Sequence, residues 1–374
     1  MAHKIELTEI RKHPPLRADK RRFGAEKAQE AANFHRTLPD YATTPLVALG
    51  ALAASLGVKG IYVKDESPRF GLNAFKGLGG SFAMHRLAEG RTGKLTFVTA
   101  TDGNHGRGVA WAAQRLGHEA YVYMPRGSAA ERLENIRALG AHAEITDLSY
   151  DDTVRFAARM AAEHGWILLQ DTAWDGYEEI PALIMQGYTT MGLEIAAQLG
   201  GILPTHIFLQ AGVGAMAGAM TAFFADHYGE HRPKIVIVEP EGANCIFRTA
   251  KADDGALHFC GVDLHSIMAG LCCGEPCTIA WEMLRDYADF ALSCEDAVAE
   301  LGMRVLGRPL PGDARIVSGE SGAATVGAAT AILREPEHTA LREALGLTAD
   351  SVLLCISTEG DTDKENYRRV MACD

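Results

Sequence analysis

Lys76 is the residue of this sequence whose type fits its expected position least well. It lies in the segment NAFKG (73–77), where a loop is expected to enter a helix. A cation at a helix N-terminus opposes the helix dipole, so Asp or Glu would be favoured there. Such a lysine can bind an anion or be neutralised as a Schiff base, and both the dipole and burial depress the pKa of its amine. A solvent-facing lysine without a function is the alternative.

A second polar group, TATDGNHGRG (99–108), follows an expected strand and opens an expected helix. Asp102 supplies a carboxylate that can serve as a base. Asp102 or Asn104 could instead cap the helix. His105 is a candidate catalyst, although a histidine in such a turn is more often held by structural hydrogen bonds.

Glycines cluster in the segment GVGAMAG (212–218), directly after the expected strand THIFLQA (205–211). Small residues let the backbone approach a ligand closely, and the N–H groups that open the following helix attract a phosphate. Two alternatives stay open at this point. The segment is compatible with a tight turn that binds nothing and, together with Glu239, with a dinucleotide-binding fingerprint.

Two further polar clusters, SGESG (318–322) and STEGDTD (357–363), lie near the end of the chain. The second follows the expected strand SVLLCIST (351–358), where a small hydroxyl can bond to a heterocyclic nitrogen. Asp361 and Asp363 are suited to capping the next helix.

The elements that must position these residues alternate between strand and helix from residue 94 onward. Apolar, β-branched runs at 94–100 and 118–125 alternate with helical patterns at 106–116 and 128–140. Strands that alternate with helices of this length form a parallel sheet. Ligands of open α/β sheets bind at the carboxyl ends of the strands, so the polar and glycine clusters are expected to meet there.

Two regions lack this alternation. The first 40 residues are polar and weakly periodic, and we expect an arm that lies over the surface or at an interface. The region 241–275 is rich in Gly, Cys and Asp and is expected to be a long irregular connection, which in a compact enzyme is more often functional than idle.

Composition excludes several classes of protein. The chain has 374 residues, 47% hydrophobic and 22% charged, and its net charge of −12 argues against a nucleic-acid surface. No stretch is apolar enough to span a bilayer and no signal peptide is recognisable, so we expect no membrane partner and a cytoplasmic, reducing setting for the eight cysteines. Cys272, Cys273 and Cys277 lack a second ligand pair at zinc spacing, so no metal is expected. Whether a disulfide forms in this region stays an open question.

The motifs, in their order along the chain, resemble the fold type II pyridoxal-phosphate enzymes, which include the threonine and serine dehydratases and the tryptophan synthase β chain. Within that group the sequence is most similar to the diaminopropionate ammonia-lyases, from about residue 40 to 370. The similarity is carried by the segments KDESPRFGLNAFK, TDGNHGRGVAWAA, QDTAWDGY, QAGVGAMAGA, MAGLCCGEP, LGMRVLG, SGESGA and ISTEGDTD.

This resemblance implies pyridoxal 5′-phosphate as the cofactor and assigns residues to it. Lys76 matches the lysine that binds the cofactor as a Schiff base, and Asn104 matches the asparagine at its phenolic oxygen. Ser357, with Thr358 as a nearby substitute, matches the hydroxyl that faces the pyridine nitrogen. The implied phosphate loop consists of Gly212, Val213, Gly214, Ala215 and Met216.

The resemblance also implies the reaction, an α,β-elimination that converts D- or L-2,3-diaminopropionate and water to pyruvate and two ammonia. The aspartates that match Asp102 and Asp171 are credited with removing the proton from the D- and the L-isomer. With Lys76 they are the implied catalytic residues, and substrate contacts are implied at Thr101, Asp102, His105 and Asp171. Asp171 could instead cap the loop before Trp174.

The implied fold is α/β, with two open, mostly parallel βαβ domains and the site in the cleft between them. Residues 1–82 and 190–374 would form the large cofactor-binding domain and residues 83–189 the small domain, in a homodimer that takes a small amino-acid substrate. Other functions stay open: a serine or threonine dehydratase-type ammonia-lyase, a ligand-binding regulatory protein, and a nicotinamide-dependent oxidoreductase. Lys76, Asp102 and the STEGD segment favour the diaminopropionate reaction over these.

Overall fold

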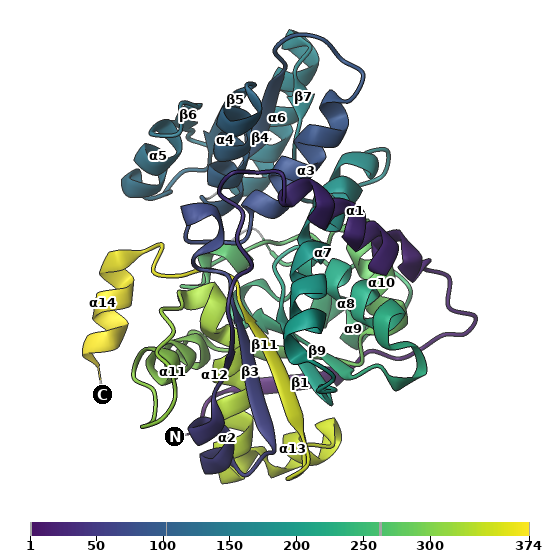
Figure 1. Ribbon diagram of the computed structural model, residues 1–374, viewed down its shortest axis with the longest axis vertical. Coiled ribbons are helices and arrows are strands. Elements are labelled where there is room, and N and C mark those ends of the chain that lie inside the picture. The colour runs from purple at the N-terminus through teal and green to yellow at the C-terminus, as the bar shows by residue number, and fades with distance from the viewer. Residues whose placement is uncertain (1, 102, 262–263, 374) are drawn as a thin grey trace.

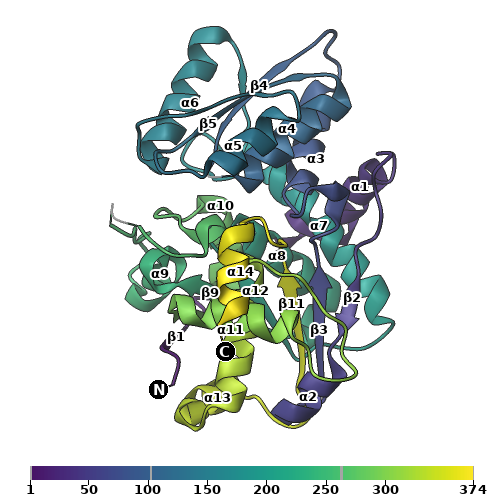
Figure 2. The same cartoon turned by 90° about the vertical axis from the view of Figure 1, so that its left-hand side faces the viewer.

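The computed structural model describes residues 2–101, 103–261 and 264–373, which form two lobes (Figure 1). One lobe is built on a seven-stranded sheet and the other on a four-stranded sheet. A view turned by 90° shows helices packed against both sheets (Figure 2). Both sheets are open, and helices alternate with their strands along the sequence. This arrangement confirms the predicted α/β class.

The large sheet has the strand order β1-β10-β9-β8-β11-β3-β2. Its strands are β1 (Ile5–Glu9), β2 (Leu46–Ala48), β3 (Gly60–Asp65), β8 (His206–Gln210), β9 (Lys234–Pro240), β10 (Phe290–Cys294) and β11 (Val352–Ser357). The inner strands are parallel, whereas β1 and β2 at the edges pair antiparallel with their neighbours. Every residue of β8 and β11 is buried, as expected for parallel strands that are covered on both faces.

The small sheet has the order β6-β5-β4-β7 and is parallel throughout. Its strands are β4 (Thr96–Ala100), β5 (Glu119–Met124), β6 (His142–Ile145) and β7 (Ile167–Leu168). The alternation predicted from residue 94 is therefore confirmed, because each of these strands is followed by a helix.

The helices carry the labels of Figure 1. They are α1 (Ala25–His35), α2 (Gly50–Leu56), α3 (Gly77–Ala88), α4 (Asn104–Leu116), α5 (Ala130–Arg137), α6 (Tyr150–His164), α7 (Glu179–Leu199), α8 (Ala215–Tyr228), α9 (Cys245–Ala252), α10 (Thr278–Tyr287), α11 (Asp296–Gly307), α12 (Glu320–Arg334), α13 (Thr339–Leu345) and α14 (Lys364–Ala372). None of the helices in the described ranges combines the length and apolarity needed to cross a bilayer.

Alternating side chains of the large sheet face two separate cores. Ile207 and Leu209 of β8 pack with α7, α8 and α10, whereas Phe208 between them packs with α11 and α12. This alternation is the two-residue period of a strand. The large sheet is therefore fixed between two layers of helices, and the turns at its strand ends are held in place.

Helices α3, α4 and α7 pack together between the lobes. A Cβ at Gly187 of α7 would lie 2.6 Å from the carbonyl oxygen of Leu78 in α3, so only glycine permits this approach. The domain boundaries that the sequence predicts, at 82/83 and 189/190, fall inside α3 and α7.

Two expectations for irregular segments are wrong in part, although most described residues from 253 to 275 are irregular as expected. The first 40 residues contain β1, which pairs with β10, and α1, which packs against α7. The region 241–275 contains α9, whose first N–H groups at Ile246 and Phe247 donate to the carboxylate of Glu239, 2.9 and 2.6 Å away. The N-cap residue Asn244 makes no side-chain capping bond, and Glu239 accepts from the first turn of α9 in its place.

No disulfide joins the cysteines of the described ranges. Among the same residues, no group of three or more His, Cys, Asp or Glu side chains is arranged to hold a metal ion.

A buried ionic network anchors the segment that leads from β3 into α3. Arg69 donates to Glu66 at 2.8 Å and to Glu194 at 2.7 Å, and Lys64 donates to Glu194 at 2.6 Å. Arg69 is only 1% exposed, so these charges are compensated by one another rather than by water.

Replacing Arg69 by alanine should therefore destabilise the fold. Glu66 and Glu194 would lose their shared cation, and removing one partner of a buried ion pair costs about 3–5 kcal/mol. We expect the free energy of unfolding, measured by urea denaturation, to fall by this amount. Arg155→Ala is the matched control, because Arg155 is 64% exposed and its surface pair with Asp152 contributes at most about 1 kcal/mol. Equal losses in the two variants would contradict this account.

Candidate active site

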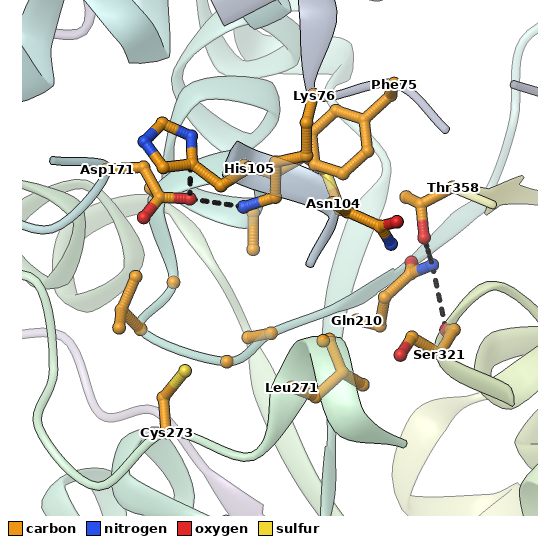
Figure 3. A pocket seen from close by; sticks show the side chains of 18 of the residues that line it. Phe75, Lys76, Asn104, His105, Asp171, Gln210, Leu271, Cys273, Ser321 and Thr358 are labelled. Carbon is orange, nitrogen blue, oxygen red and sulfur yellow. Dashed lines mark hydrogen bonds and ion pairs between the residues drawn. The ribbon is translucent and has the colours of Figure 1, made fainter. Parts of the chain in front are cut away.

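A pocket with an empty volume of about 740 Å³ lies between the lobes (Figure 3). Its walls come from the start of α3, the turn between β4 and α4, the segment after β7, the turn between β8 and α8, and the segment after β11. The predicted residues that line it are Lys76, Thr101, Asn104, His105, Asp171 and the loop 212–216. The polar and glycine clusters therefore meet at strand ends, as the sequence predicts.

Lys76 and Asp171 form the central contact of the pocket. Lys76 occupies the N-cap position of α3, and its Nζ lies 2.5 Å from Oδ2 of Asp171. Figure 3 shows the two side chains pointing toward each other. The exposed fraction is 19% for the lysine side chain and 8% for the aspartate, so the ion pair is largely withdrawn from water.

This contact changes the acid–base expectation for the lysine. Burial works against the charged amine, but the Asp171 carboxylate outweighs it and raises the pKa of Lys76. Burial also works against the Asp171 carboxylate, yet His105, when it is protonated, and Lys76 lower its pKa to about 2. The predicted depression of the lysine pKa is wrong here, because the Asp171 carboxylate lies beside the amine and stabilises its charged form.

Asp171 is positioned by the residues around the end of β7. The side chain of the preceding residue, Gln170, accepts from the backbone N–H of Ala100 at 3.0 Å and donates to the carbonyl of Ala100 at 3.1 Å, which ties the segment to β4. The backbone N–H of Gln170 donates to the hydroxyl of Tyr177 at 3.0 Å. Asp171 itself is only 6% exposed, so it is not a surface residue.

His105, the second residue of α4, is 4% exposed and faces the same carboxylate oxygen of Asp171 as Lys76 does (Figure 3). Its Nε2–H donates to the carbonyl oxygen of Leu169 at 2.8 Å, and its Nδ1 lies 3.6 Å from Oδ2 of Asp171. Burial lowers the pKa of His105. The histidine therefore has the structural hydrogen bond expected of it and also faces the candidate base.

The loop between β8 and α8 fits a phosphate group. Gly214 adopts a φ of +95°, which side-chain-bearing residues rarely adopt, and the loop ends at the N-terminus of the 14-residue helix α8. A Cβ at Gly212 would lie 3.1 Å from Cα of Leu271 and 3.3 Å from Sγ of Cys273. The backbone at Gly212 therefore has no space for a side chain, and the backbone N–H groups of the loop and the helix dipole form a cradle for an anion.

The opposite end of the pocket is polar. Nδ2 of Asn104 donates to Oε2 of Glu359 at 2.5 Å, and Nε2 of Gln210 donates to the Thr358 hydroxyl at 2.9 Å. These groups could orient the ring of a planar heterocycle by hydrogen bonds. Figure 3 shows Gln210 between Thr358 and Ser321 at this end.

The structure favours Thr358 over Ser357 as the hydroxyl of the site. Ser357 is the last residue of β11, and its hydroxyl donates to Oγ of Ser318 at 2.7 Å, away from the pocket lining. Thr358 follows it and lines the pocket. Successive residues of an extended segment point to opposite sides. The hydroxyls of Ser357 and Thr358 therefore point in different directions, and that of Thr358 belongs to the pocket lining.

The β4–α4 turn also contains the predicted substrate-binding residues Thr101 and Asp102. Asp102 lies outside the described residues. Thr101 lines the pocket, but its hydroxyl accepts from the backbone N–H groups of Gly103 at 3.0 Å and Gly106 at 3.2 Å. The Thr101 hydroxyl therefore caps the start of α4, which holds the turn in shape.

The dinucleotide alternative finds no support in the geometry. That hypothesis places the acidic residue Glu239 where it would bind a ribose. Glu239 is instead fully buried, is bonded to the first turn of α9, and is absent from the pocket lining. Burial raises its pKa to about 8.

Several lining residues were not predicted as site residues, namely Phe75, Tyr150, Gln210, Leu271, Cys273 and Glu359. Gln210 ends a predicted strand and Glu359 lies in the STEGDTD cluster, so their positions were signalled although no role was assigned. Leu271 and Cys273 belong to the predicted connection 241–275, and their place in the lining agrees with a functional use of that segment. Nothing local marks Tyr150, which starts α6.

Comparison with known proteins agrees with this site. The family described as "Pyridoxal-phosphate dependent enzyme" matches residues 37–356. The diaminopropionate ammonia-lyase of Escherichia coli (strain K12) is 50% identical over 370 residues, which covers 93% of this chain and 92% of the relative. The diaminopropionate ammonia-lyase of Salmonella typhimurium is 48% identical over 367 residues, with 91% of each chain covered.

This chain belongs to the diaminopropionate ammonia-lyase family of pyridoxal-phosphate dependent enzymes. A crystal structure of the Escherichia coli diaminopropionate ammonia-lyase in complex with an aminoacrylate-PLP azomethine reaction intermediate superposes with a TM-score of 0.91 at 47% identity. The match covers 99% of this chain and 97% of that structure. Membership of the ammonia-lyase family confirms the predicted fold type II architecture, the pyridoxal-phosphate cofactor and the carbon–nitrogen lyase class.

Gly108 gives a test of how the site is positioned. A Cβ at this position of α4 would lie 2.9 Å from the carbonyl carbon of Lys76 and 3.0 Å from the backbone nitrogen of Gly77. Gly108→Ala should therefore displace the Lys76 backbone, at a cost of about 1–3 kcal/mol. We expect the Kd for pyridoxal phosphate, measured by absorbance titration, to rise about tenfold or more, since 1.4 kcal/mol is a factor of ten.

The matched control for this substitution is Gly50→Ala at the start of α2, where a Cβ meets no atom within 4 Å. We expect this control variant to bind the cofactor like the unmodified chain. An unchanged cofactor affinity in Gly108→Ala would show that the contact between α4 and the Lys76 backbone does not position the site.

Proposed function

We propose that this protein catalyses the α,β-elimination of 2,3-diaminopropionate, with pyruvate and two molecules of ammonia as products. The observation that carries the proposal is the buried pair of Lys76 and Asp171, which lies in one pocket with the glycine loop at the start of α8. A cofactor-binding amine, a base and a phosphate cradle are the groups that such an elimination requires.

The residues that would hold the cofactor surround the pocket. Lys76 supplies the amine that binds it covalently, the loop 212–216 supplies N–H groups for its phosphate, and Asn104 and Thr358 supply polar contacts to its ring. When bound, pyridoxal phosphate takes up the electron pair left on the substrate when the Cα proton departs.

Asp171 is suited to accept that proton. Its carboxylate is ionised beside Lys76, projects into the pocket, and is held by the segment tied to β4. We assign it to the L-isomer and Asp102 to the D-isomer, as the resemblance implies. A positioned general base contributes about 10²–10⁴-fold to the rate.

The departing group also needs a proton. A β-ammonium leaves as neutral ammonia, whereas an unprotonated amine would have to leave as amide ion. The carboxylates of Asp171 and Glu359 in the lining favour a substrate that carries this extra positive charge. We infer a preference for the diamine over serine from this charge.

Assembly as a homodimer and a cytoplasmic location stay predictions from the sequence.

The absorbance spectrum of the purified protein provides the first test. We expect the band of lysine-bound pyridoxal phosphate near the edge of the visible range, and its loss in Lys76→Ala. Lys94→Ala is the control, because Lys94 is 57% exposed on the small lobe and is expected to leave the band intact. A protein that stays colourless when pyridoxal phosphate is added would overturn the proposed chemistry.

Stereochemistry provides the second test. Asp171→Asn keeps the shape of the side chain but removes the base, so we expect kcat for L-2,3-diaminopropionate to fall by about 10²-fold or more, with a smaller loss for the D-isomer. Asp102→Asn should show the opposite preference. Pyruvate formation from each isomer measures both effects, and faster pyruvate formation from serine would favour the dehydratase alternative. Equal losses for both isomers would refute the division of roles.

A further inference from the structure

The hydrogen bonds of His105 define its tautomer. Its Nε2 lies 2.8 Å from the carbonyl oxygen of Leu169, and a carbonyl can only accept, so Nε2 carries the proton. The side chain is 4% exposed, and burial lowers its pKa, so the imidazole is neutral near pH 7. In this state Nδ1 carries a lone pair and acts only as an acceptor.

That lone pair faces the candidate base. Nδ1 lies 3.6 Å from Oδ2 of Asp171, and within the described part of the chain it makes no hydrogen bond. A buried nitrogen without a hydrogen-bond partner is uncommon and calls for an explanation. An acceptor gains nothing from an ionised carboxylate, but it can accept a hydrogen bond from a protonated one.

The two neighbours of Asp171 thus favour opposite protonation states. Among the described residues, the charged groups that face His105 are Asp171, from the segment after β7, and Lys76, from the start of α3. Lys76 at 2.5 Å stabilises the ionised carboxylate, which can take up a proton. Neutral His105 offers the acceptor that the same carboxyl needs after it has taken up the proton. During the reaction Asp171 must alternate between the ionised and the protonated state. Lys76 stabilises the first state and His105 stabilises the second.

We propose that His105 is a positioning residue for Asp171, whose Nδ1 accepts a hydrogen bond from the carboxyl group while Asp171 holds the Cα proton of the substrate. In this step the Cα–H bond breaks, an O–H bond forms on Asp171, and the electron pair stays with the substrate. The new O–H donates to Nδ1 without further proton transfer. The inference rests on the proposed function, in which Asp171 is the base for the L-isomer.

Two substitutions separate this role from a structural one. His105→Gln can keep a donor for the Leu169 carbonyl but has no lone pair at the position of Nδ1. His105→Asn places an amide near Asp171 and gives up the bond to Leu169. The exposed His231→Gln is the matched control. All variants are examined as holoenzymes, and the cofactor absorbance band reports whether each has folded.

We expect kcat for L-2,3-diaminopropionate to fall at least about tenfold in His105→Gln, with KM little changed and a smaller effect on the D-isomer. Loss of the acceptor destabilises protonated Asp171 and lowers its pKa, so the acidic limb of the kcat profile should move to lower pH. The isotope effect with Cα-deuterated substrate should increase. Unchanged kcat, an unmoved acidic limb, or equal losses for both isomers would show that His105 is only structural.

A measurement on the unsubstituted holoenzyme covers the case in which His105→Gln does not fold. ¹⁵N NMR of histidine-labelled protein, assigned with His105→Asn, should show the Nε2–H tautomer at neutral pH, and a proton on Nδ1 would overturn the inference. Asp171→Asn distinguishes a failure of Asp171 as the base from a failure of the role of His105. If it retains L-isomer turnover, the assignment of Asp171 as base fails and His105 loses its role as well. If it loses that turnover while His105→Gln is unaffected, only the role of His105 fails.

Discussion

The ion pair between Lys76 and Asp171 is the constraint on which the site depends. The two residues come from opposite sides of the pocket and lie 2.5 Å apart with little access to water. Separating two charges that are buried in this way would leave each uncompensated, which is strongly unfavourable. The start of α3 and the end of β7 must therefore lie close together, and the packing between the lobes permits this approach.

The approach is made possible by small residues in the helices between the lobes. A side chain at Gly187 of α7 would collide with the backbone of Leu78, and one at Gly108 of α4 would collide with the backbone of Lys76. Well-packed interiors do not absorb even one extra methyl group without movement. Three helices thus fix the backbone from which the lysine side chain extends, while its Nζ is free to meet a partner in the pocket.

The opposite side of the pocket follows a different principle. The loop 212–216 joins a fully buried strand to a helix and presents N–H groups in place of side chains. Its geometry depends on the positive φ of Gly214 and on the close approach of Leu271 to Gly212. The loop 212–216 is thus suited to an anion, and the Lys76–Asp171 pair is suited to proton transfer. The layers of helices around the large sheet fix the positions of these two parts relative to each other.

The sequence alone indicated the class of fold and marked Lys76, Asn104 and the glycine loop as site residues. These are local signals: a misplaced cation, a polar turn and a run of glycines, each read within a few residues. Residue-by-residue similarity to one family supplied the cofactor and the reaction. The sequence did not reveal β1, which pairs with β10, or α9, whose first turn donates to the buried carboxylate of Glu239.

Tertiary structure decided the protonation states and the choice between neighbouring side chains. The pKa of Lys76 is raised rather than lowered because a carboxylate far away in sequence lies beside it. Thr358 rather than Ser357 lines the pocket because the direction of each side chain depends on how the end of β11 lies against its neighbours. Electrostatic interactions and side-chain directions depend on distances through space, and only the folded chain sets those distances.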